Sequence, residues 1–225
     1  MSESAQTSAD EISVRVLLVD DHDLFRTGLR NLLEERGVQV VGEAATGLDA
    51  VRLVRELAPD VVVMDLHMPG ISGIEAIRQI AAIAPLTRML VLTISDQDED
   101  VLHAILAGAC GYLLKDASVD ELIRGIEAAA LGESLVSPAI AGKVLQQVRA
   151  TAISPEAAEA VRADLSHREL DVLKLIASGK DNAMIAVELH ISPKTVKNHI
   201  SNILMKLQIE NRIQAAVYAV RSGIV

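Results

Sequence analysis

The sequence predicts a doubly wound α/β domain with a five-stranded parallel sheet, followed by an all-α domain of four helices. In the first half, short and continuously apolar runs alternate with amphipathic segments of about ten residues, which is typical of a parallel sheet covered on both faces. In the second half, the strand pattern stops and only helical spacing remains. A chain of 225 residues, half of them apolar, can form two domains with cores of their own.

The elements of the first domain follow from β-branched runs and from the helical spacing between them. The expected strands are residues 14–19, 38–42, 61–64, 89–92 and 111–114. The expected helices are residues 24–36, 48–57, 73–83, 98–107 and 119–131. Gly37 is a typical helix stop, and Asp23 and Ser72 are expected to cap helix starts. Residues 14–131 therefore contain five βα units, which predicts an open sheet and not a barrel.

The second domain is predicted over residues 164–225, after a change in composition. Residues 1–13 are polar and acidic and indicate a disordered tail, and residues 132–163 indicate a linker with one short helix that begins at Ser137. The expected helices of the second domain are residues 166–177, 182–189, 193–207 and 212–221. Ser192 as N-cap and Pro193 as first helical residue are a strong start signal for the third of them.

Charge is unevenly distributed along the chain. The net charge is −10, but from Arg162 onward nine Lys/Arg stand against six Asp/Glu, and the rest of the chain has 12 against 25. An acidic module joined to a mildly basic one is indicated. The single cysteine, Cys110, excludes an intrachain disulfide framework, and no apolar run is long enough for a bilayer. We therefore expect a cytoplasmic protein with no membrane partner.

Polar residues stand at the carboxyl ends of the expected strands. Asp20 and Asp21 follow the first strand, Asp65 the third, Thr93 ends the fourth and Lys115 follows the fifth. Ligands of open parallel sheets bind at these ends. Converging carboxylates need a cation such as Mg²⁺, and a carboxylate can accept a phosphoryl group whose oxygens a lysine and a hydroxyl then hold. A single Asp after a strand is more often a turn or cap residue, but the whole set indicates phosphoryl chemistry.

The runs LLVDDHDLFRTGL, DVVVMDLHMPGISGIEAI, LVLTISD and GACGYLLKD carry these residues. They resemble the receiver domain of two-component response regulators, a flavodoxin/CheY-like fold. The resemblance implies that Asp65 is the phosphoacceptor and that Lys115 pairs with the phosphoryl oxygens. It also implies Mg²⁺ ligation by Asp21, Asp65 and the backbone carbonyl of His67, with Asp20 acting largely through water.

Thr93 and Tyr112 match the hydroxyl and aromatic positions that rearrange in receivers on phosphorylation. The added oxygens draw Thr93 inward, and the vacated space admits the ring of Tyr112. This change is expected to shift the face formed by the fourth helix, the fifth strand and the fifth helix, which is the usual dimerisation surface in the family. His67 and Ser95 occupy positions that affect how fast the phosphoryl group hydrolyses in receivers.

The second domain has the spacing of a helix-turn-helix motif, whose second helix enters the major groove of DNA. The residues expected to face its core are Val196, Ile200, Ile203, Leu204 and Leu207. The run LSHRELDVLKLIASGKDNAMIAVELHISPKTVKNHISNILMKLQIENRIQAAVYAV resembles the LuxR/NarL-type DNA-binding domain. The resemblance implies base contacts from Lys197, Asn198 and Ser201. Residues expected near phosphates are Lys194, Thr195 and Lys206, and the final helix is expected to supply a dimer contact.

Together, the two resemblances identify the chain as a member of the NarL/FixJ family of response regulators. They imply phosphorylation of Asp65 by a sensor histidine kinase, dependence on Mg²⁺, and a homodimer that binds double-stranded promoter DNA when phosphorylated. No enzyme activity is expected. Two alternatives stay open: a hydrolase with an aspartyl-phosphate intermediate, and a phosphorylation-independent DNA-binding regulator whose receiver serves only for dimerisation.

Overall fold

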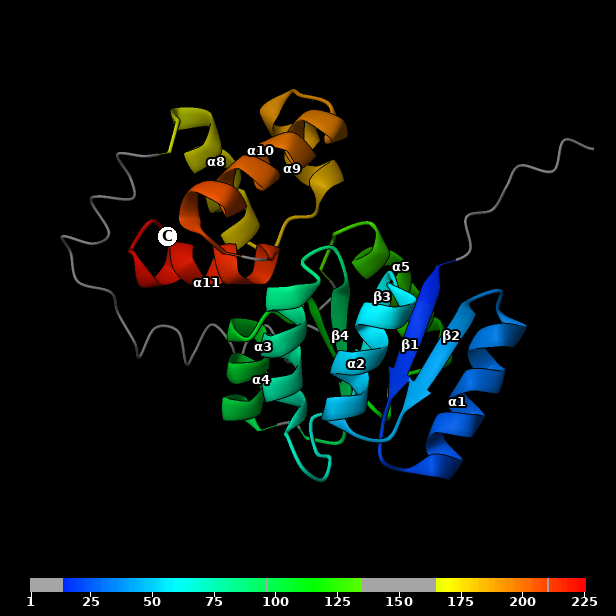
Figure 1. Cartoon of the computed structure of the whole chain (residues 1–225). Coiled ribbons are helices and arrows are strands. Elements are labelled where there is room, and N and C mark those ends of the chain that lie inside the picture. Colours follow the sequence, from blue (N-terminus) through cyan, green and yellow to red (C-terminus); the bar gives the residue numbers. More distant parts are fainter. Residues whose placement is uncertain (1–13, 96, 135–164, 210) are drawn as a thin grey trace, which may run out of the picture.

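The computed structural model of the chain describes residues 14–95, 97–134, 165–209 and 211–225 (Figure 1). Within these ranges an α/β unit is followed by a helical unit, as the sequence predicts. The predicted N-terminal tail and the predicted linker helix at Ser137 lie outside the described residues. Among the described helices, none has both the length and the apolar character that crossing a membrane requires.

The α/β unit is built on a parallel sheet with the strand order β2-β1-β3-β4-β5. Its strands are β1 (Arg15–Val19), β2 (Gln39–Ala44), β3 (Val61–Met64), β4 (Arg88–Thr93) and β5 (Gly111–Leu114). The strand order reverses between β1 and β3, and this is where ligands bind in doubly wound sheets, at the carboxyl ends of the strands. The predicted fold class is therefore confirmed, and the site is expected beyond the ends of β1 and β3.

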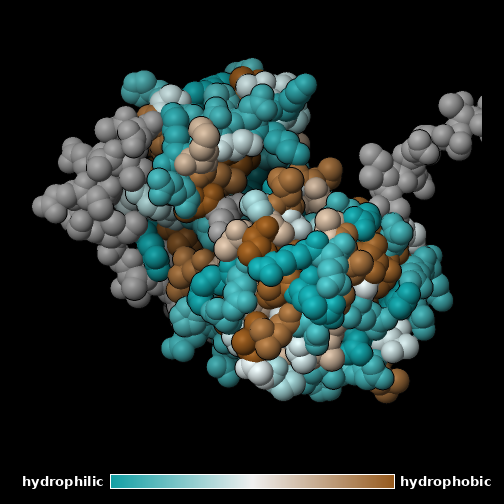
Figure 2. Space-filling model, viewed as in Figure 1, coloured by the Kyte–Doolittle hydropathy of each residue, from teal (hydrophilic) through white to brown (hydrophobic). Residues whose placement is uncertain are grey.

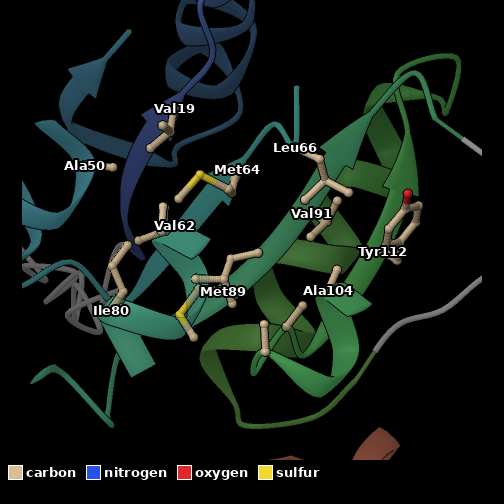
Figure 3. Close-up of a cluster of buried hydrophobic side chains, with 14 of the residues drawn as sticks. Val19, Ala50, Val62, Met64, Leu66, Ile80, Met89, Val91, Ala104 and Tyr112 are labelled. Carbon is tan, nitrogen blue, oxygen red and sulfur yellow. The ribbon is translucent and has the colours of Figure 1, made fainter. Parts of the chain in front are cut away.

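Helices cover both faces of this sheet. They are α1 (Asp23–Glu35), α2 (Gly47–Leu57), α3 (Gly73–Ile83), α4 (Asp98–Leu106) and α5 (Val119–Ala130). Because side chains of a strand alternate between the two faces, Leu17 and Val19 join a core cluster with α2, α3 and α4 (Figure 3), whereas Val16 and Leu18 join another with α1 and α5. These two clusters fix the sheet from both sides.

One of the two predicted caps in this unit is correct. Ser72 caps α3, because its hydroxyl accepts a hydrogen bond from the backbone N–H of Glu75. The prediction for Asp23 is wrong: α1 begins at Asp23 itself, and the residue before it, His22, makes no side-chain cap. The turn before α1 is closed by Asp20, whose carboxylate accepts the N–H of His22 at 2.8 Å.

The helical unit consists of α8 (His167–Ala177), α9 (Asn182–Leu189), α10 (Pro193–Leu207) and α11 (Arg212–Arg221) in the described residues. Ser192 caps α10 through the N–H of Thr195, and Pro193 is its first residue, as predicted. His190 ends α9 in the left-handed region, with φ 53°, which makes the turn between the two helices short. All five residues predicted to face the core from α10 belong to its apolar cluster or pack against it.

The two units touch through α11, which lies against α4 (Figure 1). Asn211 donates a side-chain hydrogen bond to the carbonyl of Ala109 at 3.0 Å, and Gln214 donates one to the carbonyl of Ile105 at 2.9 Å. Val217 of α11 is buried in the same cluster as the residues of α4. The face seen in Figure 2 has hydrophobic residues in separate patches among hydrophilic ones.

Candidate functional site

Three carboxylates and an imidazole meet beyond the ends of β1 and β3. One donor atom from each of Asp20, Asp21, His22 and Asp65 lies within 4.8 Å of the others. Asp20 and Asp65 are 4% and 3% exposed, so two negative charges are held close together away from water. β1 and β3 are neighbouring parallel strands, which is why residues 45 positions apart come together here. The structure thus brings together the predicted acidic set.

Lys115 is placed between two of these carboxylates. Its Nζ lies 2.6 Å from Oδ2 of Asp20 and 2.6 Å from Oδ2 of Asp65, and 4.7 Å from the ring centre of Phe25. Burial is the largest single influence on the pKa of Lys115 and lowers it, but the hydrogen bonds and charges of the two carboxylates outweigh it, so the pKa is raised. Lys115 therefore stays charged at the site, as a partner for anionic oxygens requires.

Backbone groups fix the second oxygen of Asp65. Its Oδ1 accepts the N–H of Leu66 at 2.7 Å, and the N–H of His67 lies 3.3 Å away. The start of α3 presses on this loop at Gly73, where a Cβ atom would lie 2.1 Å from the carbonyl oxygen of Asp65. Since real Cβ atoms do not approach backbone that closely, only glycine fits there. A glycine in the run PGISG thus serves the placement of the predicted phosphoacceptor.

The acidic cluster fits a hard divalent cation. Among the described residues, Oδ1 of Asp21 is buried and accepts no hydrogen bond, although Nδ1 of His22 lies 2.8 Å from it. Lys115 supplies one positive charge against three carboxylates, so the site keeps an excess of negative charge. Carboxylate oxygens are the ligands that Mg²⁺ prefers. The donor set and the unsatisfied oxygen therefore suit a divalent metal.

The two predicted switch residues lie at the end of β4 and in β5. Thr93 is fully buried, and its Oγ1 lies 3.4 Å from the N–H of Ser95. Tyr112 is also fully buried, with its hydroxyl donating to the carbonyl of Ser95 at 2.9 Å. Both side chains therefore contact the backbone of Ser95, in the loop that follows β4. The ring of Tyr112 already occupies the inward position that was expected to follow phosphorylation.

The predicted DNA-reading side chains lie on one helix. Of the predicted side chains, Thr195 is half-buried beside Ser192, and the others are exposed: Lys194, Lys197, Asn198, Ser201 and Lys206. This surface offers cationic and amide donors suited to phosphates and base edges. The ammonium of Lys206 also pairs with the buried carboxylate of Glu169 at 2.8 Å, a contact that the sequence pattern did not indicate. Ser201 donates its hydroxyl to the carbonyl of Lys197.

One of these side chains already has a partner in the α/β unit. The ammonium of Lys197 donates to the carbonyl of Leu131, the C-cap residue of α5, at 2.8 Å. A second polar contact joins Asn182 of α9 to Glu133 at 3.2 Å. Neither contact could be found from spacing, because the partners lie 66 and 49 residues apart. Together with α11 on α4, they hold the helical unit against the other.

The fold and the site define a class of protein: an acidic α/β signalling domain joined to a helix-turn-helix DNA-binding domain. Residues 16–127 match the family model "Response regulator receiver domain", and residues 163–219 match "Bacterial regulatory proteins, luxR family". The chain belongs to the two-component response regulators of the NarL/FixJ type, which combine these two domains.

Relatives match over nearly the whole length. The "Transcriptional regulatory protein LiaR" of Bacillus subtilis (strain 168) is 46% identical over 213 residues, which are 94% of this chain and 99% of that protein. The crystal structure of the response regulator ChrA of a heme-sensing two-component system is 36% identical with a TM-score of 0.51, covering 95% of this chain and 99% of that one. A structure of RcsB dimers bound to DNA is 26% identical with a TM-score of 0.54, covering 93% and 98%.

Proposed function

We propose that this response regulator controls transcription through phosphorylation of Asp65 by a sensor histidine kinase, and that the phosphorylated chain dimerises and binds promoter DNA. The observation that carries the proposal is the placement of Lys115 between Asp20 and Asp65, 2.6 Å from each. A buried carboxylate with a charged lysine at one oxygen and two backbone N–H groups at the other is held ready to accept a phosphoryl group.

The transfer itself is a displacement at phosphorus. A carboxylate oxygen of Asp65 forms the new bond to phosphorus, and the bond from phosphorus to the imidazole nitrogen of the kinase's phosphohistidine breaks with its electron pair on that nitrogen. Lys115 pairs with the oxygens of the arriving group, and Thr93 donates its hydroxyl to them. Asp21, Asp65 and the carbonyl of His67 would hold Mg²⁺, with Asp20 acting through water, and the ion would supply neutralising charge for those oxygens.

The contacts between the two units support a resting form whose affinity for DNA is reduced. Lys197, which is proposed to contact bases, is engaged by the carbonyl of Leu131, and α11, which is proposed to join two DNA-binding domains, lies against α4. Since the ring of Tyr112 is already buried in the inward position, phosphorylation is proposed to act by favouring a state in which these contacts are released. The RcsB structure, in which dimers are bound to DNA, supports the dimeric form for this family.

The test uses the full chain with acetyl phosphate and Mg²⁺, followed by intact mass spectrometry. Wild type and the control variant Asp49→Asn, which changes a half-exposed carboxylate of α2, are expected to gain one phosphoryl group, and Asp65→Asn none. Equal uptake by Asp65→Asn contradicts the proposal. Continuous release of phosphate from an excess of phosphate esters would favour the hydrolase, and DNA binding indifferent to phosphorylation would favour the regulator whose receiver only dimerises.

A further inference from the structure

Asp20 and Asp21 follow one another in the chain, yet both carboxylates reach the same acidic cluster. In an extended chain, successive side chains point to opposite faces of the sheet. The backbone therefore has to turn after β1 to bring both carboxylates within 4.8 Å of the donor atom of Asp65. The peptide group between Asp20 and Asp21 is the part of the backbone whose orientation decides where the carboxylate of Asp21 lies.

The carbonyl of this peptide group is held by Arg26 of α1. Nη1 of Arg26 donates to the carbonyl oxygen of Asp20 at 2.6 Å. The N–H of Asp20 donates to the carbonyl of Ala44 at 3.1 Å, which continues the pairing of β1 with β2. Both backbone polar groups of Asp20 are thus fixed, one by the sheet and the other by a side chain.

The guanidinium of Arg26 is itself held in place. Its side chain is only 12% exposed, and α1 packs against β1 and β2 (Figure 1). Nε of Arg26 donates to Oε2 of Glu43 on β2 at 3.1 Å, and Nη2 donates to Oδ1 of Asp23 at 2.5 Å. Glu43 is held in turn by Arg30, whose Nη1 donates to its Oε1 at 2.7 Å. Because a guanidinium is planar and all three of its nitrogens are engaged, its orientation is fixed.

The positive charge of Arg26 is already offset by the carboxylates of Asp23 and Glu43. Lys115, in contrast, contacts carboxylates of the acidic cluster directly. A cation in that place competes with a metal for the same oxygens, so its removal favours metal binding. Arg26 reaches the cluster through a backbone oxygen, and its removal is expected to have the opposite effect.

We propose that Arg26 is a positioning residue: by holding the carbonyl of Asp20, it orients the turn that places the carboxylates of Asp20 and Asp21 for a divalent cation. This inference rests on the Mg²⁺ site of the proposed function. A turn that is formed before the cation arrives does not have to be ordered during binding, and avoiding that cost strengthens binding.

The first test is isothermal titration calorimetry of the unphosphorylated full chain with MgCl₂. Arg26→Ala is expected to bind Mg²⁺ about tenfold more weakly than wild type, as the loss of one hydrogen bond from a charged donor implies. Arg26→Lys keeps the charge, but one ammonium group cannot reproduce the planar fork, so a loss of about threefold is expected. Arg52→Ala, which removes an arginine that likewise joins two carboxylates on α2, is expected to match wild type.

The second test separates positioning from a general weakening of the fold. The rate of phosphoryl uptake from acetyl phosphate is followed as the Mg²⁺ concentration is raised. In Arg26→Ala the half-saturating Mg²⁺ concentration is expected to rise by about tenfold, far more than the maximal rate falls. The midpoint of thermal unfolding is measured for each variant, and if Arg26→Ala does not fold, Arg26→Lys carries both tests.

An affinity for Mg²⁺ that is unchanged or higher in Arg26→Ala overturns the inference, because Arg26 would then act through its charge alone or not at all. So does a lower maximal rate with an unchanged half-saturating Mg²⁺ concentration, or a wild-type chain that binds no Mg²⁺. A wild-type chain that binds Mg²⁺ but takes up no phosphoryl group overturns the proposed function, and the calorimetry still decides the role of Arg26.

Discussion

At the scale of single residues, the site is an arrangement of buried charge. Asp20 and Asp65 are buried side by side and would repel each other, but Lys115 lies 2.6 Å from both and offsets that repulsion. One positive charge does not balance three carboxylates, so the cluster still favours a cation. A phosphoryl group arriving at Asp65 would find the lysine already in place.

Removing that lysine is expected to strengthen metal binding. Lys115→Ala leaves the carboxylates without their cation, so we expect the affinity of the unphosphorylated protein for Mg²⁺ to rise about tenfold. Isothermal titration calorimetry with MgCl₂ measures this, with Lys180→Ala in the helical unit as the control. An affinity that falls in Lys115→Ala would show that the lysine does not compete with the metal for these oxygens.

Gly73 is expected to tolerate no side chain. In Gly73→Ala the new Cβ atom would lie 2.1 Å from the carbonyl oxygen of Asp65, and only a backbone shift relieves the overlap. We expect a loss of about 2–3 kcal/mol in the free energy of unfolding. Gly28→Ala is the matched control, because nothing lies within 4 Å of its added Cβ and alanine favours the helix α1 by about 0.5–1 kcal/mol. Urea unfolding measures the free energy of unfolding of both variants. Equal values for the two would contradict the close approach of residue 73 to the carbonyl oxygen of Asp65.

Glu169 makes the stability of the helical unit depend on acid. Burial raises the pKa of Glu169. The Lys206 ammonium and the hydrogen bonds of Ser166 together lower the pKa by more than burial raises it, so the pKa lies below the ordinary 4.5. A carboxyl whose pKa is lowered by folding stabilises the fold above its unfolded pKa, and this contribution is lost as the pH falls through the folded value. Thermal unfolding below pH about 4.5 is expected to depend less on pH in Glu169→Gln than in wild type. Identical pH dependence would contradict this role.

At the scale of elements, the contact of α11 with α4 is one of those that join the two units. The carboxamide of Asn211 caps α11 by accepting the N–H of Gln214 at 2.9 Å and also donates to the carbonyl of Ala109. The start of α11 is thus formed and docked by the same side chain. Asp100, near the start of α4, accepts the hydroxyl of Ser95 from the loop after β4, and the carbonyl of Ile105, near its end, accepts the side chain of Gln214. The loop after β4 and the DNA-binding unit therefore both contact this helix.

Loosening this contact is expected to raise DNA affinity without phosphorylation. Gln214→Ala removes the hydrogen bonds to the carbonyls of Ile105 and Leu106, and we expect about fivefold tighter binding by the unphosphorylated chain to a duplex selected from a random pool. Fluorescence anisotropy measures the affinity. Gln79→Ala on α3 removes the same kind of side chain elsewhere and is expected to leave affinity unchanged. Tighter DNA binding by Gln79→Ala, or an unchanged DNA affinity of Gln214→Ala, would contradict the idea that this contact weakens DNA binding by the unphosphorylated chain.

Elements were predictable to the degree that their signals are local. The bounds of β3, β5, α3, α9, α10 and α11 agree with the sequence pattern to the residue, because each is a strong apolar or capped segment. Asp23 was assigned to a cap wrongly, because Asp20 closes that turn from the strand before it. The pair of Lys206 with Glu169 and the contacts of Lys197 and Asn211 depend on how helices pack, which periodicity does not encode.

At the scale of the whole molecule, a negatively charged receiver and a mildly positive DNA-binding unit are in contact, and each covers part of a surface that the other is proposed to use. The receiver holds Lys197 and covers part of α11, while α11 covers part of α4. The carboxylates of the site, Asp20, Asp21 and Asp65, were all predictable from the sequence, because the carboxyl ends of neighbouring parallel strands lie at the same edge of the sheet. What the sequence could not supply is the docking of the two units, which depends on residues about a hundred positions apart.

The measurement that tests the central claim most directly is the DNA affinity of the full chain with and without beryllofluoride and Mg²⁺, which together mimic the phosphoryl group on Asp65. If phosphorylation controls DNA binding, wild type binds the selected duplex at least about tenfold more tightly with the mimic, and Asp65→Asn binds equally with or without it. An affinity of wild type that does not change would contradict control by phosphorylation, and so would a rise that persists in Asp65→Asn.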